Sequence, residues 1–210
     1  MERFGEHYDS WRMTRQTKIE SIFGKEFFKG KKILELACGY GDNGIHFANL
    51  GAEVTFTEGR QEHIDIFKQR YPDKEIILLN QEFEWDLQRK FDIVIHWGVL
   101  YHIDKWQQDL ACAAKHADLI FLESEVCDSN DEDVDLKIEP ADRYDQELGQ
   151  YASRPSANNI EKNLKQLGFN FTRYDDEDLN AGMHQYSWKV ENTLTWKYGL
   201  RRFWVVNKNV

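Results

Sequence analysis

The chain has 210 residues, of which 41% are hydrophobic, enough for one domain with a single core. Its formal net charge is −10, from 37 acidic and 27 basic residues, which disfavours long-range attraction to a phosphate backbone. We therefore expect a small-molecule partner rather than nucleic acid. No apolar run approaches the roughly 20 residues of a membrane span, and the N-terminus has no apolar signal core. Both features argue against a membrane protein.

The three cysteines, Cys38, Cys112 and Cys127, show no paired metal-type spacing. An odd number also does not suit a disulfide framework. We expect a cytoplasmic protein without a metal site.

The first element expected is a helix within residues 7–24, which have a helical pattern. Apolar runs then alternate with helical segments, an order typical of a parallel sheet with crossover helices. The five runs predict strands at 32–37, 53–57, 75–79, 91–97 and 118–123. The segments between them predict helices at 43–50, 61–70 and 104–116, the last with Asp104 as its N-cap.

A polar and acidic stretch, residues 126–155, follows the fifth run and is too long for an ordinary connection. We interpret it as an insertion that could cover a substrate, although a solvated charged loop fits its acidic part as well. Ser156 is then expected to cap a helix that extends to about Leu167. Further strands are expected at 169–174, 186–190 and 202–206.

A glycine-rich loop joins the first predicted strand to the next helix. Glycine allows backbone torsions and close approach that a Cβ would block, so a cofactor can lie against the main chain there. Gly39 to Gly44 has the spacing G-x-G-x-x-G, and Glu58 ends the second strand, where it could hold ribose hydroxyls. This pattern alone fits a nicotinamide or flavin oxidoreductase.

Two features favour a methyl donor instead. Glu35 lies near the end of the first strand, where a carboxylate suits a cationic amino acid moiety and would repel a pyrophosphate. The glycines also begin two residues later than in a dinucleotide fold, after the step Ala37-Cys38. The charge of Glu35 therefore separates the two interpretations.

The segment ILELACGYGDNG resembles motif I of class I S-adenosylmethionine-dependent methyltransferases, with Ala37 in place of the first glycine. VTFTEGR, LLNQEFEW and FDIVIHWGVLYHI resemble three later motifs in the same order. The resemblance implies an α/β, Rossmann-like three-layer sandwich with a mostly parallel seven-stranded sheet and a late antiparallel strand. It also implies S-adenosylmethionine (SAM) as cofactor and S-adenosylhomocysteine (SAH) as product. We expect a single domain over 1–210, with 1–30 as an N-terminal helical lid.

The resemblance places the ribose at Glu58 and the adenine near Gln81, where an amide stands in place of the more common aspartate. An amide oxygen can still accept from the adenine amino group. The full set of expected cofactor contacts is Glu35, Ala37, Cys38, Gly39, Tyr40, Gly41, Asn43, Glu58, Gly59, Arg60, Gln81, Glu82, Phe83, His96, Trp97 and Gly98, with Tyr8, Trp11 and Arg15 from the N-terminal helix.

The methyl acceptor is less well specified by the sequence. Methyl transfer is an in-line displacement that needs alignment and exclusion of water, and a base only where the acceptor carries a proton. His102 and Tyr101, after the fourth strand, are the candidate catalytic residues, and a packing role for His102 is equally consistent. Tyr151 and Arg201 are candidate acceptor contacts, since a guanidinium can bind an anion in a fork.

Three other functions remain open at this stage. The fourth strand and the segment PSANNIEKNLKQLGF also resemble tRNA wobble-uridine modifying enzymes. This resemblance implies a methyltransferase, or a related transferase, that acts on tRNA. An oxidoreductase rests on the glycine spacing alone. A binding protein that kept the fold without catalysis is the third.

Overall fold

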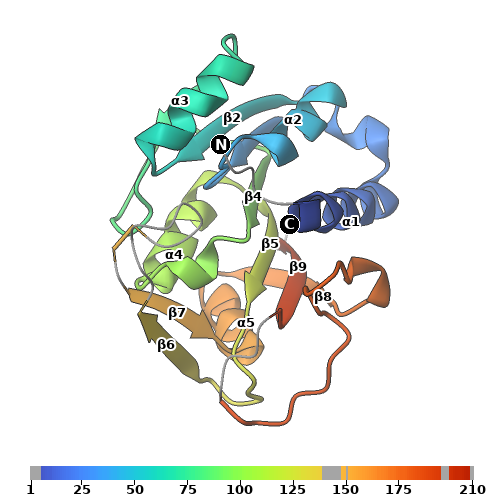
Figure 1. Ribbon diagram of the computed structural model, residues 1–210, viewed down its shortest axis with the longest axis vertical. Coiled ribbons are helices and arrows are strands. Elements are labelled where there is room, and N and C mark those ends of the chain that lie inside the picture. Colours follow the sequence, from blue (N-terminus) through green and yellow to red (C-terminus); the bar gives the residue numbers. More distant parts are fainter. Residues whose placement is uncertain (1–5, 139–147, 150, 195–198, 209–210) are drawn as a thin grey trace.

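A seven-stranded sheet forms the centre of the protein (Figure 1). The computed structural model describes residues 6–138, 148–149, 151–194 and 199–208. The strands lie in the order β3-β2-β1-β4-β5-β9-β8. Their bounds are β1 Lys32–Glu35, β2 Glu53–Glu58, β3 Ile76–Leu78, β4 Ile93–Trp97, β5 Leu119–Glu125, β8 Phe169–Tyr174 and β9 Arg201–Lys208. The helices are α1 Glu6–Phe23, α2 Asp42–Asn49, α3 Gln61–Arg70, α4 Trp106–His116 and α5 Ala157–Gln166, with short 3₁₀ turns η1 Lys25–Phe28, η2 Leu100–His102 and η3 Glu177–Leu179.

The pairing of the strands confirms the expected fold class. Strands β1 to β5 pair in parallel, and β9 runs antiparallel between β5 and β8. The order of the parallel strands reverses between β1 and β4. In open α/β sheets, ligands bind at this reversal, beyond the carboxyl ends of the strands.

Alternate residues of the strands fill two separate cores, as expected for a sheet covered on both faces. Ile33, Ile95 and Phe203 belong to the cluster that α1 and α2 cover. Leu34, Val94 and Trp204 belong to the cluster under α4 and α5. The two cores lie between the sheet and the helices on each of its faces, which is the arrangement of a three-layer sandwich. Helix α1 confirms the predicted N-terminal helix.

Most predicted elements lie within two or three residues of the observed ones, and two details are wrong. Ser156 caps α5 as predicted, with its side chain accepting from the backbone N–H of Asn159. Asp104, however, does not cap α4, which begins at Trp106 without a side-chain cap. The strand expected at 186–190 is absent, although these residues are described. Both edges of β9 already pair with β5 and β8, so only an isolated bridge forms between Gln185 and Leu200.

The insertion after β5 contains a two-stranded ribbon that the sequence analysis did not predict. Strands β6 (Val134–Ile138) and β7 (Tyr151–Pro155) pair antiparallel. Residues 139–147 and 150 lie outside the described part of the chain. Leu148 lies against Gly59, where a Cβ added to that glycine would come within 2.4 Å of it. The insertion therefore reaches the carboxyl edge of the main sheet.

None of the described helices is long and apolar enough to cross a membrane.

Candidate active site

A pocket opens at the carboxyl ends of β1, β2 and β4, on the side where the strand order reverses. Helix α1 borders it with Tyr8, Trp11 and Arg12, and the insertion borders it with Leu148. The pocket joins the glycine loop, the ends of three parallel strands and the loop after β4. This arrangement suits an elongated ligand with several polar groups.

The glycine loop at the pocket floor has the left-handed backbone expected of it. Gly39 has φ 56° and Gly41 has φ 86°. A Cβ at Gly41 would also lie 2.4 Å from the ring of Phe67. Ala37, which replaces the first glycine of the motif, has φ 47° despite its side chain. Alanine in this conformation is strained by about 1–2 kcal/mol.

We therefore expect Ala37→Gly to raise the free energy of unfolding by about 0.5–1 kcal/mol. Relief of the strain would exceed the roughly 0.5–1 kcal/mol that glycine costs through greater freedom of the unfolded chain. Urea unfolding of the two proteins checks this. Ala48→Gly, within helix α2, is the control and should lower the free energy instead. A destabilised Ala37→Gly protein would show that the left-handed position is not strained.

Glu35 ends β1 as a buried carboxyl group that lines the pocket. Its Oε2 accepts from the backbone N–H of Gly44 at 2.9 Å. Burial raises the pKa of Glu35 to about 8, and nearby Asp42 adds to this effect while the Gly44 N–H and Arg12 oppose it. The site therefore holds a carboxyl group that a cationic ligand would readily convert to a carboxylate.

Glu58 ends the neighbouring strand β2 and is also buried. Its carboxylate accepts from the backbone N–H groups of Gly39, Gly59 and Arg60 at 2.9, 2.9 and 3.0 Å. A carboxylate has about four acceptor positions, so it retains capacity for a ligand hydroxyl group. Glu58 thus connects the glycine loop to the start of α3 and faces the same pocket.

Gln81 lines the pocket beyond β3 and is held from behind by Asp109 of α4. Its Nε2 donates to Asp109 Oδ1 at 3.0 Å. His96, which was expected to contact the cofactor, is instead fully buried within β4, and its Nε2 lies 2.6 Å from Asp109 Oδ2. The structure therefore places His96 behind the pocket wall, because its side chain points to α4.

The opposite end of the pocket is aromatic. Trp11, Trp97, Tyr101 and His102 line it together with Gly98. Gly98 has φ 71°, and a Cβ there would lie 3.1 Å from the Trp11 ring. The absence of a side chain at Gly98 lets α1 pack closely against the end of β4.

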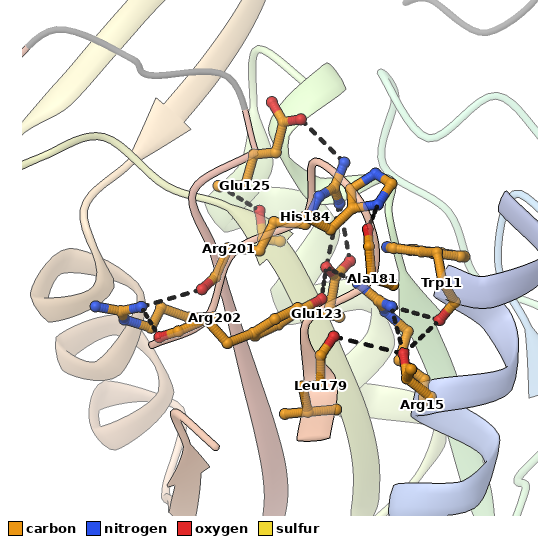
Figure 2. A network of polar contacts seen from close by, with 12 residues as sticks. Trp11, Arg15, Glu123, Glu125, Leu179, Ala181, His184, Arg201 and Arg202 are labelled. Atoms are coloured by element: carbon orange, nitrogen blue, oxygen red, sulfur yellow. Dashed lines mark hydrogen bonds and ion pairs between the residues drawn. The ribbon is translucent and has the colours of Figure 1, made fainter. Parts of the chain in front are cut away.

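A buried network of charges supports this aromatic end (Figure 2). Arg15 Nη2 donates to Glu123 Oε1 at 2.8 Å, and Arg201 Nη1 lies 3.1 Å from both Glu123 oxygens. The other nitrogen, Arg201 Nη2, donates to the Tyr101 hydroxyl and to Glu125 Oε1, each at 2.9 Å. Burial raises the pKa of Tyr101 well above its usual range, although Arg201 opposes this. Tyr101 therefore remains protonated at neutral pH.

Most of the expected site residues line this one pocket. They are Glu35, Ala37, Cys38, Gly39, Asn43, Glu58, Gly59, Arg60, Gln81, Glu82, Trp97, Gly98, Tyr8, Trp11, Tyr101 and His102.

The remaining expected residues are not among the lining residues. Besides His96, they are Tyr40, Gly41, Phe83, Arg15, Tyr151 and Arg201. Phe83 and Tyr151 are 65% and 58% exposed, whereas Arg15 and Arg201 are buried and directed at Glu123. Tyr40 packs edge-on against His63, and Gly41 is the N-cap residue of α2. Burial in the charge network keeps both arginines from the pocket wall.

Sequence reasoning missed several lining residues. These are Arg12, Leu36, His63, Leu79, Asn80, Ile95, Val99, Ile103 and Leu148. Most of them are neighbours of motif residues in the sequence. Their positions near the ends of the predicted strands could therefore have identified them as pocket residues. Leu148 had no signal, because only the folded insertion brings it to Gly59.

A family model described as "Methyltransferase domain" matches residues 8–174. Among curated proteins, none matches the chain. Among solved structures, the N-terminal domain of EvdMO1 with SAH bound has a TM-score of 0.71 at 18% identity, covering 95% of this chain and 81% of that chain. Magnesium protoporphyrin IX methyltransferase (ChlM) from Synechocystis PCC 6803 with bound SAM has a TM-score of 0.60 at 16% identity, covering 100% of this chain and 86% of that chain. The glycopeptide N-methyltransferase MtfA complexed with SAM has a TM-score of 0.63 at 13% identity, covering 93% of each chain.

Proposed function

Because the chain belongs to the methyltransferase-domain family, we propose that it transfers a methyl group from SAM to a small-molecule acceptor. The observation that carries the proposal is the pair of buried carboxyl groups, Glu35 and Glu58, on either side of the glycine loop in one pocket. Glu35 suits the α-ammonium group of the methionine moiety, and Glu58 suits the ribose hydroxyls. Gln81 lies further along the same wall and suits the adenine.

A small acceptor is supported by the net charge of −10 and by the aromatic end of the pocket. Similar structures include EvdMO1 in the presence of SAH and D-fucose, a porphyrin methyltransferase and a glycopeptide methyltransferase. These relatives support a compact acceptor over a nucleic acid. The aromatic side chains would exclude water from the reacting groups.

The cofactor, when bound, supplies a methyl group on a cationic sulfur atom. The chain's own residues would then align the acceptor, exclude water and receive a proton. His102 is the candidate base, because it lines the aromatic end of the pocket. Tyr101 would instead position the acceptor, since its hydroxyl accepts from Arg201 and stays protonated.

The test of the proposal is a calorimetric titration of the protein with SAH and, separately, with NAD. Saturable binding of SAH without binding of NAD is expected. Methyl transfer from labelled SAM would then be measured on a panel of small hydroxyl and amine acceptors and on tRNA. Failure to bind SAH would remove the proposal, and turnover with tRNA alone would remove its small-molecule part.

Binding of SAH should also release a proton at Glu35. The pKa of Glu35 is raised to about 8 by burial, so this group is mostly protonated at pH 7. An α-ammonium group beside it would lower the pKa and favour the carboxylate. We therefore expect affinity to rise by up to about tenfold per pH unit from pH 6 to pH 8 and then to level off.

Titrations at several pH values, in buffers with different ionisation enthalpies, measure this proton. In Glu35→Gln, which cannot ionise, affinity should be weaker and the rise with pH should disappear. A wild-type affinity that is constant from pH 6 to pH 8 would contradict the role given to Glu35.

A further inference from the structure

Asp109 of α4 is a fully buried carboxylate that lies behind the pocket wall. Three side chains donate to it, two from the segment after β3 and one from β4. Gln81 Nε2 and Trp85 Nε1 donate to Oδ1 at 3.0 and 2.8 Å, and His96 Nε2 lies 2.6 Å from Oδ2. A buried carboxylate is costly unless it is satisfied in this way. Asp109 therefore holds the segment after β3 against β4 and α4.

The orientation of the Gln81 amide follows from this contact. A carboxylate only accepts hydrogen bonds, so the nitrogen branch of the amide must face Asp109. Gln81 also lines the pocket. The oxygen branch is then the one left for a ligand, and rotation of the amide by 180° would place two oxygens against each other. Asp109 thus determines which hydrogen-bonding group Gln81 can present.

We propose that Asp109 is a positioning residue that makes the pocket select adenine. The inference rests on the proposed function, which brings an adenosyl group to Gln81. A fixed oxygen accepts from the 6-amino group of adenine and meets the 6-oxo group of hypoxanthine as a second acceptor. An amide that is free to rotate would bind either base, because it could present its NH₂ group to the 6-oxo group. Selectivity therefore depends on Asp109 and not on Gln81 alone.

The experiment compares SAH and S-inosyl-L-homocysteine by calorimetric titration. The two ligands differ only at one edge of the base, where a 6-oxo group replaces the 6-amino group and N1 carries a hydrogen. Wild-type protein should prefer SAH by about tenfold or more, because the 6-oxo base leaves acceptors unpaired. In Asp109→Ala the ratio of the two affinities should fall close to one. Asp109→Asn should restore the preference, since its oxygen can accept from Gln81 while its amide faces His96.

Trp85→Phe is the matched control, because it removes another donor from the same carboxylate oxygen and leaves the Gln81 contact in place. If the role of Asp109 were purely structural, Asp109→Ala would weaken the binding of both ligands equally and leave the ratio of their affinities unchanged. A preference that survives in Asp109→Ala would therefore overturn the proposal. So would equal binding of both ligands to the wild type. If the wild type binds neither ligand, the proposed function itself fails.

A measurement on the wild-type protein keeps the proposal testable if Asp109→Ala does not fold. The Nε2 protons of Gln81 should exchange slowly with solvent in cofactor-free protein, as seen by NMR, because one of them is bonded to a buried carboxylate. Rapid exchange of both protons would overturn the proposal.

Discussion

Replacing Glu123 by alanine should lower the free energy of unfolding by about 3–5 kcal/mol, because it leaves buried charges without their counter-charge. Glu123 is fully buried and contacts Arg15, Arg201 and the hydroxyl of Tyr186, the last at 2.6 Å. Burial lowers the pKa of Arg15, and Glu123 opposes this effect. For Arg201, Glu123, Tyr101 and Glu125 together outweigh burial and raise the pKa.

The effect of this substitution should extend from the sheet to the N-terminal helix. Glu123 lies on β5, Arg15 on α1 and Arg201 on β9, so the carboxylate connects three elements that are distant in sequence (Figure 2). Thermal unfolding should show a midpoint lowered by about 10 °C, given roughly 2–4 °C per kcal/mol for a chain of this length.

Glu84→Ala is the matched control for Glu123→Ala. Glu84 pairs with Lys115 at 3.0 Å, but the two side chains are 66% and 54% exposed. Exposed ion pairs contribute about 0–1 kcal/mol to the free energy of unfolding, so the midpoint of thermal unfolding should hardly change. A similar small change in Glu123→Ala would show that the two arginines find other partners or water.

Features encoded by local pattern could be predicted from the sequence, and features created by long-range packing could not. The apolar runs gave the five parallel strands, because a buried strand must be apolar on both faces. Glu35 and Glu58 could be placed in one pocket because adjacent parallel strands end at the same edge. Their meeting there followed from strand order alone.

The errors have a common physical origin. Arg201 and Arg15 resemble ligand-binding arginines in sequence, yet each is directed at Glu123, which is 78 or 108 residues away. His96 was expected at the pocket, but a strand alternates its side chains between two faces, and this one faces Asp109. Tyr186 belongs to a predicted strand that does not form, and its hydroxyl donates to Glu123, which is 63 residues away. Arg15, Arg201 and Tyr186 contact a partner more than 60 residues away, whereas the partner of His96 is 13 residues away on the next helix. In each case the partner is brought to the side chain by tertiary packing and not by local sequence.

Replacing Glu58 by alanine should weaken SAH binding by about 100-fold. One hydrogen bond from a ribose hydroxyl to a carboxylate contributes about 1.5–3 kcal/mol to binding, and each 1.4 kcal/mol is tenfold in affinity. The substitution also removes the acceptor for the backbone N–H groups of Gly39, Gly59 and Arg60, so the glycine loop loses its connection to α3. Both effects act on the cofactor and not on the acceptor.

The control for Glu58→Ala is Glu62→Ala, which removes the same charge from the first turn of α3, where the side chain is 66% exposed and outside the pocket lining. Its SAH affinity should remain within about twofold of the wild type, because an exposed charge near the pocket is largely screened. Calorimetric titration of the three proteins with SAH measures the difference. Equal losses in the two variants would mean that overall charge, not the ribose contact, governs binding. No loss in Glu58→Ala would place the ribose elsewhere in the pocket and remove the basis for assigning Gln81 to the adenine.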